Sequence, residues 1–252
     1  ANTDLVVKTD RMPSPGETIL GGSFMMSGGG KGANQAVAAS RLGGEVTFVA
    51  RVGNDLFGER ALAGYRAERL DVRHVTRDAT VPSGVALICV DGAAENSIVV
   101  APGANERLSP EDVDRAEAEI AAADFVVLQL EIPLPAVMRA AEVAERHGVR
   151  VILNPAPAAA IPDELLRRCY LLTPNRGRGA FRRASALGGG AFRHGGFGDR
   201  RHAHGRPKRR SDARRGRCTA GGGLTTMHVR SVRRGCDRIP TSKINENPAN
   251  FR

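Results

Sequence analysis

Short apolar segments recur along the first 175 residues of the chain and predict the strands of a buried sheet. Residues 45–51 alternate between apolar and polar side chains, which is the period of a strand. Residues 124–130 and 149–154 are continuous apolar runs with β-branched side chains, and residues 169–175 form a fourth apolar segment. Unbroken runs of this kind are typical of strands that are covered on both faces.

Helical patterns lie between these predicted strands. Residues 33–42 are rich in alanine, and residues 133–148 end at a glycine, a common signal after the last helical turn. The helix expected over residues 109–123 starts with Ser109 as N-cap and Pro110 in the first position, followed by acidic residues. Strands that alternate with helices in this way indicate an α/β fold with a parallel sheet covered by helices.

Two further segments have strand-like composition without a helix between their strands. They are residues 16–28 and residues 84–101, and residues 91–96 supply turn residues within the second segment. We expect these lid strands, which lie within residues 5–30 and 83–101, to form a small separate sheet that serves as a lid or an interface.

Charge is divided unevenly along the chain. The formal net charge is +10, yet residues 1–175 carry 17 Lys and Arg against 23 Asp and Glu, whereas residues 176–252 carry 20 against 4. The basic character therefore belongs to the C-terminal segment alone. A nucleic-acid-binding function of the whole chain is not supported by this distribution.

The sequence favours a cytoplasmic protein. No apolar run approaches the roughly 20 residues of a membrane span, and the N-terminus lacks the pattern of a signal peptide. The chain also lacks an initiator Met, so we expect its start to be missing. The cysteines form no C-x-x-C pair, so we expect reduced thiols without a disulfide framework or a zinc site. They are Cys89, Cys169, Cys218 and Cys236.

The segment over residues 28–60, which begins with a glycine-rich stretch at the start of a predicted helix, is the most informative segment for function. Glycines let the backbone approach a ligand closely, and free N–H groups at a helix start favour anions and polar oxygens. Lys31 and Asn34 add side-chain donors beside it. The phosphate-binding pattern G-x-x-x-x-G-K-[ST] is not satisfied. An ordinary glycine-rich turn before a helix is the alternative interpretation.

A longer pattern carries a resemblance to a known family. The run G-G-K-G-A-N-Q-A-V-A-A, then R-L-G-G, then V-G-N-D-x-F-G resembles the N-terminal signature of the ribokinase family of carbohydrate kinases. Further pieces follow in the family's order, and the resemblance continues to residue 175 without a gap. These pieces are N-T-D (2–4), P-G-E-T (15–18), P-S-G-V-A (82–86), P-G-A-N (102–105), Q-L-E (129–131), N-P-A-P-A (154–158) and T-P-N (173–175).

The resemblance implies a Rossmann-like fold, with a mostly parallel sheet flanked by helices and a small β-lid over a sugar. It implies transfer of the γ-phosphoryl group of ATP to a primary sugar hydroxyl, with Mg²⁺ and a monovalent cation such as K⁺ as cofactors. Homodimers that pair through the lid are a further implication. Asn175 matches the nucleotide-binding Asn near Mg²⁺ and the phosphates. The residues that match the family's sugar-binding positions are Asn2, Asp4, Gly30, Lys31, Asn34 and Glu131.

The chemistry of these side chains agrees with sugar binding. Carboxylates such as those of Asp4 and Glu131 accept hydrogen bonds from hydroxyl groups. Lys31 and Asn34 donate them. Glu131 also follows the carboxyl end of a predicted strand, where open α/β sheets bind ligands. Taken singly, Asp4 fits a solvated turn, Glu131 a helix start and Lys31 an exposed surface, so the prediction depends on the joint pattern.

Two parts of the family pattern are missing after residue 175. The family takes its catalytic base from an Asp in G-A-G-D, which residues 176–252 lack, so no catalytic residue is assigned. Asp199, in G-F-G-D, follows no strand pattern. Arg178 occupies the Glu position of the family's N-x-x-E motif, and a guanidinium cannot replace a carboxylate near Mg²⁺. No metal ligand is therefore assigned either.

The C-terminal third of the chain, residues 176–252, is expected to be irregular or disordered. Leu, Ile, Val and Phe make up only 10 of its 77 residues, against 18 Arg and 14 Gly. A basic arm that binds nucleic acid is one interpretation. The favoured hypothesis is a shifted reading frame, because Arg outnumbers Lys by 33 to 4, which suggests GC-rich coding. A one-base shift could replace Arg176 and Arg178 with glutamates and so restore N-x-x-E.

The sequence thus predicts a sugar-binding domain over residues 1–175, followed by an aberrant, basic, low-complexity tail. The implied activity is ATP-dependent phosphorylation of a pentose, D-ribose to ribose 5-phosphate, with this chain impaired. A non-catalytic sugar-binding remnant, a basic-tail interaction protein, and a kinase for fructose or adenosine stay open as alternatives. The expected partners are a small-molecule sugar and ATP, with no membrane and no nucleic acid.

Overall fold

The computed structural model describes residues 1–174 and the backbone of residues 224–228. The strands are β1 (Asn2–Lys8), β2 (Ser23–Gly29), β3 (Glu45–Gly53), β4 (Val75–Asp78), β5 (Gly84–Val90), β6 (Asn96–Ala101), β7 (Phe125–Leu128), β8 (Arg150–Leu153), β9 (Cys169–Leu172) and β10 (Leu224–His228). The helices are α1 (Lys31–Arg41), α2 (Leu56–Ala67), α3 (Pro110–Asp114), α4 (Glu117–Ala122), α5 (Leu134–Arg146), α6 (Asp163–Arg168) and the 3₁₀ helix η1 (Gly103–Arg107).

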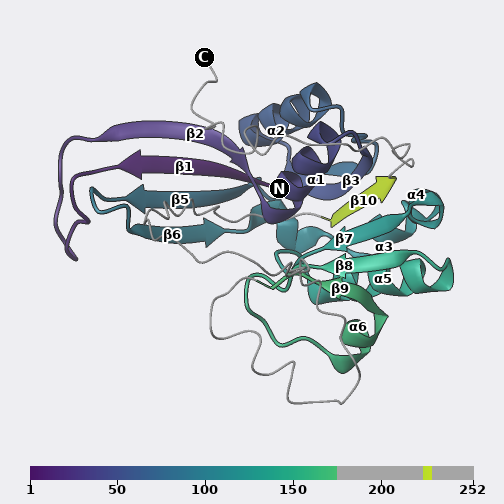
Figure 1. Ribbon diagram of the computed structural model, residues 1–252. Coiled ribbons are helices and arrows are strands. Elements are labelled where there is room, and N and C mark those ends of the chain that lie inside the picture. The colour runs from purple at the N-terminus through teal and green to yellow at the C-terminus, as the bar shows by residue number, and fades with distance from the viewer. Residues whose placement is uncertain (175–223, 229–252) are drawn as a thin grey trace, which may run out of the picture.

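The strands form two sheets. A six-stranded sheet has the order β4-β3-β10-β7-β8-β9, in which β4 and β3 are parallel, as are β7, β8 and β9, while β10 is antiparallel to both of its neighbours. A four-stranded sheet, called the lid sheet below, has the order β2-β1-β5-β6. The lid sheet extends to one side of the helices, and the N-terminus lies where the two parts meet (Figure 1).

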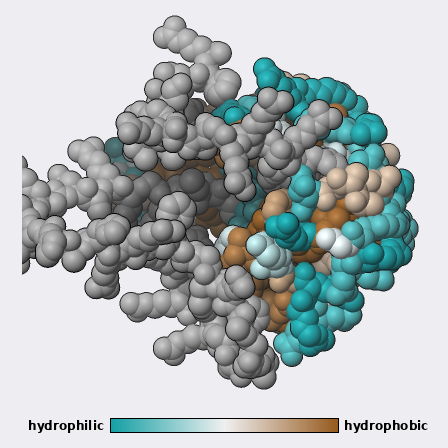
Figure 2. Space-filling view, turned by 45° about the vertical axis from the view of Figure 1, so that its right-hand side comes forward, coloured by the Kyte–Doolittle hydropathy of each residue, from teal (hydrophilic) through white to brown (hydrophobic). Residues whose placement is uncertain are grey.

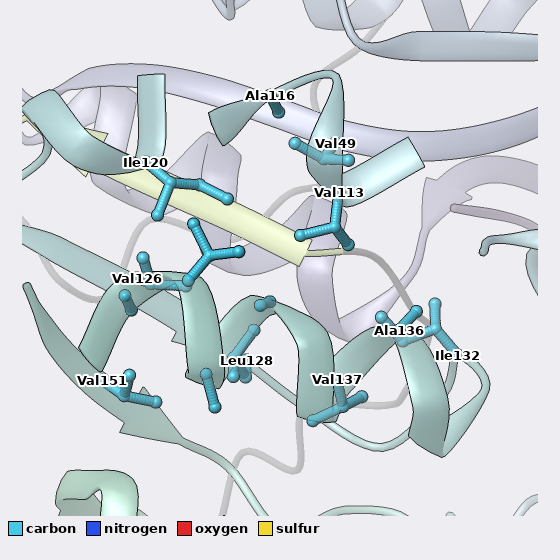
Figure 3. Close-up of a cluster of buried hydrophobic side chains, with 14 of the residues drawn as sticks. Val49, Val113, Ala116, Ile120, Val126, Leu128, Ile132, Ala136, Val137 and Val151 are labelled. Carbon is cyan, nitrogen blue, oxygen red and sulfur yellow. The ribbon is translucent and has the colours of Figure 1, made fainter. Parts of the chain in front are cut away.

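Helices cover both faces of the six-stranded sheet, and the pattern of β3 shows why. Successive side chains of a strand point to opposite faces. Phe48 of β3 is fully buried in one cluster with residues of α1 and α2, whereas Val49 is fully buried in another. The second cluster brings together side chains of α3, α4 and α5 with Val126 and Leu128 of β7 and Val151 of β8 (Figure 3). The continuous apolar runs predicted as doubly covered strands therefore line this core.

The four strands predicted between helices are all present as β3, β7, β8 and β9. The helices predicted from residues 33 and 133 are present as α1 and α5. The helix expected over residues 109–123 is divided into α3 and α4, because the backbone at Ala116 leaves the helical region (φ −101°, ψ 11°) while its side chain is fully buried. Ser109 is the N-cap of α3, as predicted, and the structure adds a capping box with Asp112.

Several elements differ from the sequence-based expectation. Residues 16–22 are not a strand, and the partner of β2 is β1, whose start at Asn2 precedes the expected bounds. The polar residues of β1 weaken its strand pattern, and only the pairing across the lid sheet reveals it. Helices α2 and α6 and strand β4 were not predicted. Within the C-terminal third, β10 is a strand, so the expectation of irregular structure is wrong for those residues.

Hydrophilic residues line the right-hand edge of the face seen in Figure 2, and apolar residues are visible toward the middle of that face. Among the residues that the structure describes, no helix has the length and apolar character needed to cross a membrane. The lid sheet departs from this polar surface, because several of its large apolar side chains are exposed. They are Phe24, Met25, Met26, Leu87, Ile98, Val99 and Val100.

Candidate functional site

The face of the lid sheet that carries Asn2 and Asp4 turns toward the start of α1. Both residues lie on β1, two positions apart, so their side chains share one face of the sheet. In register, Asn2 lies opposite Gly29 of β2 and Gly84 of β5. Asn2 is 5% exposed and Asp4 is 6% exposed. The sequence alone left Asp4 open as a solvated turn residue, and its burial contradicts that alternative.

Asp4 is a buried carboxylate with an unusual environment. Its Oδ1 is buried without a hydrogen-bond partner among the described residues. Burial, and then the nearby Glu131 carboxylate, raise the pKa of Asp4 to about 6, although Lys31 counteracts part of this effect. A Cβ on Gly29 would lie 2.1 Å from Asp4 Oδ1, so only glycine leaves room for the carboxylate there. A buried acceptor without a protein partner is a group prepared to bind a polar ligand.

Lys31 and Glu131 form the second part of the site. Lys31 Nζ lies 2.5 Å from Glu131 Oε1, and the backbone N–H of Lys31 donates to Glu131 Oε2 over 3.1 Å. Glu131 therefore caps the N-terminus of α1 from a different element, which the helix dipole favours. The two side chains are 17% and 14% exposed, so the alternative of a surface lysine is contradicted. Burial raises the pKa of Glu131, and the ion pair with Lys31 offsets part of that shift.

Gly30 connects β2 to α1 with a backbone that only glycine adopts easily. Its φ is +114°, and it is buried directly before the first helical residue. Asn34 lies one turn further along α1, so it shares a helix side with Lys31. It is exposed, and its backbone N–H donates to the Gly30 carbonyl over 2.6 Å. The glycine-rich segment thus opens a helix, as its sequence predicts.

The structure gathers Asp4, Lys31 and Glu131 into one cluster of interacting charges, although they lie on three different elements. Asn2, Gly30 and Asn34 flank this cluster along β1 and α1. Asn175 lies outside the described residues. Within the described part of the chain, no group of three His, Cys, Asp or Glu side chains could hold a metal ion.

Two structural residues beside the site had no role assigned from the sequence. Asn105 of η1 is 2% exposed, and its Nδ2 donates to Asn2 Oδ1 over 2.7 Å. Asp55 caps α2 by accepting from Gly58 N over 2.8 Å, and it also accepts from Ser83 N and Ser83 Oγ, each over 2.7 Å. Asn105 belongs to the P-G-A-N motif and Asp55 to V-G-N-D-x-F-G, so these motifs were the sequence signal that could have indicated a role for both residues.

Helices cover the larger sheet, and charged groups lie at the edge of that sheet beside the lid sheet. These features define the class of protein: an α/β ligand-binding fold with a lid. The model of the pfkB family of carbohydrate kinases matches residues 1–177, and the chain belongs to this family. The resemblance inferred from the sequence motifs is therefore confirmed.

Relatives and solved structures agree with this assignment. The chain is 44% identical to a ribokinase of Haemophilus influenzae over 174 residues, which cover 69% of this chain and 57% of that protein. It is 40% identical to a deoxyribokinase of Salmonella typhi over 173 residues, which cover 68% of this chain and 56% of that protein. The chain thus spans little more than half the length of these relatives.

Among solved structures, the chain is similar to the ribokinase of Thermotoga maritima, with 34% identity and a TM-score of 0.62, covering 69% of this chain and 57% of that one. It is also similar to the ribokinase of Arabidopsis thaliana complexed with ribose and ATP, with 32% identity and a TM-score of 0.59 over the same shares. The mixed α/β fold expected from the sequence is confirmed by these matches.

Proposed function

We propose that residues 1–175 form the sugar-binding domain of a kinase that phosphorylates D-ribose to ribose 5-phosphate with ATP. The observation that carries the proposal is the buried Oδ1 of Asp4, which has no hydrogen-bond partner among the described residues and lies in the same charge cluster as the Lys31–Glu131 ion pair. A pentose offers several hydroxyl groups in fixed positions, and each needs acceptors and donors. The similarity to ribokinases supports ribose as the substrate.

Each proposed side chain has a distinct role in that site. Asp4 and Glu131 accept hydrogen bonds from sugar hydroxyls, because ionised carboxylates are acceptors only. Lys31 and Asn34 donate to sugar oxygens. Gly30 lets the sugar approach the start of α1. A fructose, a 2-deoxyribose or a nucleoside such as adenosine would present different hydroxyl groups to the same set of residues.

The cofactors ATP and Mg²⁺ belong to the proposal through the family. The ribokinase of Arabidopsis thaliana was solved with ribose and ATP, and that of Cryptococcus neoformans with ADP. In residues 1–174, the acidic groups of the site are Asp4 and Glu131, and they do not form a three-ligand metal site. Asn175 is proposed to lie near the nucleotide because it matches the Asn of the family's N-x-x-E motif.

We also propose that this particular chain binds sugar but turns it over poorly. Its residues 176–252 contain no G-A-G-D segment, and Arg178 stands at the Glu position of N-x-x-E. A shifted reading frame accounts for both departures and for the basic composition of the tail. Sequencing the coding DNA across codons 170–185 tests the frameshift: it is refuted if a one-base shift yields no glutamate codon in place of those for Arg176 and Arg178.

The direct test of function is isothermal titration calorimetry of the full chain with D-ribose, 2-deoxy-D-ribose, D-fructose and adenosine. We expect D-ribose to bind without ATP and to bind more tightly than the other three. In a coupled assay for ADP release with ATP and Mg²⁺, we expect turnover near background. Absence of any sugar binding would contradict the proposed function, whereas robust turnover of ribose would contradict the impairment alone. Binding of nucleic acid with a steep salt dependence would instead favour a basic-tail interaction protein.

We propose further that the lid sheet pairs two copies of the chain. The register aligns Met26, Leu5, Leu87 and Val99 in one row across all four strands, on the face opposite Asp4. Leu87 is 54% exposed and Val99 is 67% exposed. An apolar row of this kind on a single sheet face is typical of an interaction surface.

We expect Leu87→Glu to convert a dimer into a monomer, because it places a charge in the middle of this apolar row. Sedimentation velocity at several protein concentrations measures the change. The matched control is Leu42→Glu, since Leu42 is 83% exposed at the end of α1, away from the lid. A parent chain that sediments as a monomer, or equal effects of the two variants, would contradict pairing through the lid.

A further inference from the structure

Asn105 makes a dense set of hydrogen bonds at the junction between the lid sheet and the helix-covered sheet. Its Nδ2 lies 2.9 Å from the carbonyl oxygen of Ala1, 2.8 Å from that of Pro102 and 2.7 Å from Asn2 Oδ1. Because an amide nitrogen has two N–H donors, two of these three acceptors share one of them. Its Oδ1 accepts from the backbone nitrogen of Ala1 over 2.6 Å. Asn105 is 2% exposed, and η1, on which it lies, packs against β3 and β5.

These contacts determine which way the Asn2 side chain points. Two of the three acceptors around Asn105 Nδ2 are backbone carbonyls, which cannot donate, so the Asn105 amide has one orientation only. Asn2 must therefore present its Oδ1 to Asn105. Its Nδ2, with two N–H donors, faces away from Asn105. Within residues 1–174, no group accepts a hydrogen bond from Asn2 Nδ2.

Gly84 packs directly against the side-chain amides of Asn2 and Asn105. A Cβ at Gly84 would lie 2.2 Å from Asn2 Oδ1 and 2.3 Å from Asn105 Nδ2. Contacts that short do not occur, so a side chain there would push the two amides apart. The start of β5 thus holds the pair in place without contributing a side chain.

We propose that Asn105 is a positioning residue for the sugar site: it holds the Asn2 amide so that its N–H groups face the ligand as donors. This inference rests on the proposed function, in which Asn2 contacts a hydroxyl-rich ligand. Asn2 then supplies donors next to the acceptor Asp4, two positions further along β1. Without Asn105, the Asn2 amide can rotate, and half of its orientations present an oxygen where a donor is needed.

A double-mutant cycle tests this role, with D-ribose affinity measured by calorimetry on the full chain. We expect Asn105→Ala to weaken ribose binding about tenfold, as for the loss of one hydrogen bond of about 1.4 kcal/mol. In an Asn2→Ala background, we expect Asn105→Ala to cause no further loss, because it acts through Asn2. Fully additive losses would overturn the inference. The control is Leu108→Ala, which removes a buried side chain of the neighbouring core and should lower stability without changing affinity.

Two further measurements keep the test decisive if Asn105→Ala folds poorly. Gly84→Ala disturbs the same amide pair from β5, so we expect it to weaken ribose binding to a similar extent. NMR of the Asn2 side-chain amide, measured without sugar, should show large shifts of both N–H signals in either variant. Unchanged signals would overturn the positioning role. If the variants show these shifts but the parent chain binds no ribose, the proposed function is contradicted instead.

Discussion

Asp4→Asn is expected to weaken binding of D-ribose at least a hundredfold. The parent carboxylate can accept hydrogen bonds from two hydroxyl groups, and each charge-assisted hydrogen bond contributes about 1.5–3 kcal/mol. An amide keeps only one acceptor oxygen and has no charge, so a loss of about 3 kcal/mol follows, which is about a hundredfold in Kd. Calorimetry at pH 8, where Asp4 is ionised, measures the difference.

Through Asp4, the affinity for ribose should rise with pH, whereas the free energy of unfolding should fall. The raised pKa of Asp4, about 6, means that the folded protein binds a proton here more tightly than the unfolded chain does. Its contribution to stability is therefore full below the ordinary aspartate pKa of about 4 and is lost as pH rises through about 6. If ribose binds the ionised form of Asp4, as proposed, its affinity should rise over the same range and be about tenfold weaker at pH 5 than at its plateau.

Asp10→Asn is the matched control, since Asp10 is an exposed carboxylate just beyond β1. We expect it to leave ribose affinity and its pH dependence unchanged. Subtracting the stability profile of Asp4→Asn from that of the parent isolates the contribution of Asp4. A parent affinity that does not vary between pH 5 and 8 would contradict the assignment of Asp4 as the ionised acceptor.

Lys31→Met is expected to lower the free energy of unfolding by about 2–3 kcal/mol at pH 7, toward the lower end of the cost of breaking a buried ion pair. The ammonium group contacts the Glu131 carboxylate and attracts that of Asp4 electrostatically, and its removal leaves two buried negative charges without this compensation. Glu131→Gln should cost less, because it also removes the repulsion between Glu131 and Asp4. The double variant should fall between the two, and guanidinium denaturation followed by circular dichroism measures all three.

The exposed ion pair between Arg11 and Glu17 provides the comparison for this prediction. Glu17→Gln removes the same kind of carboxylate at a site where the two side chains are 59% and 33% exposed. We expect a change of about 0.5 kcal/mol or less, as for exposed ion pairs in general. If Lys31→Met lowered the free energy of unfolding no more than Glu17→Gln does, the Lys31 ammonium would not be compensating the buried carboxylates, and the prediction would be contradicted.

Much of the fold could be predicted from the sequence, because local patterns carry it. The strand β3 and the apolar runs of β7, β8 and β9 show periodicities that a buried sheet requires. Elements with weaker local signals were missed. β1 alternates polar and apolar residues only partly. The N-cap of α2 is Asp55, whose carboxylate is also held by Ser83, a residue distant in the chain.

The candidate site, too, was predicted in part: its residues could be found from the sequence, whereas their contacts could not. Motif spacing pointed to Asp4, Lys31 and Glu131, but it could not show that the Lys31 amine and backbone both contact Glu131. P-G-A-N was noticed without a role for Asn105, because its partners Ala1 and Asn2 lie more than 100 residues away in sequence.

The sequence by itself determined the class of this protein, the strands β3, β7, β8 and β9 and the residue types of its site, since periodicity and motif order are properties of neighbouring residues. Only the tertiary structure decided that Asp4 Oδ1 is buried without a hydrogen-bond partner among the described residues and that Asn105 donates to Asn2. The physical reason is that burial, pKa and hydrogen-bond partners depend on which distant segments meet. In this chain, the lid sheet, η1 and the end of β7 meet around the start of α1.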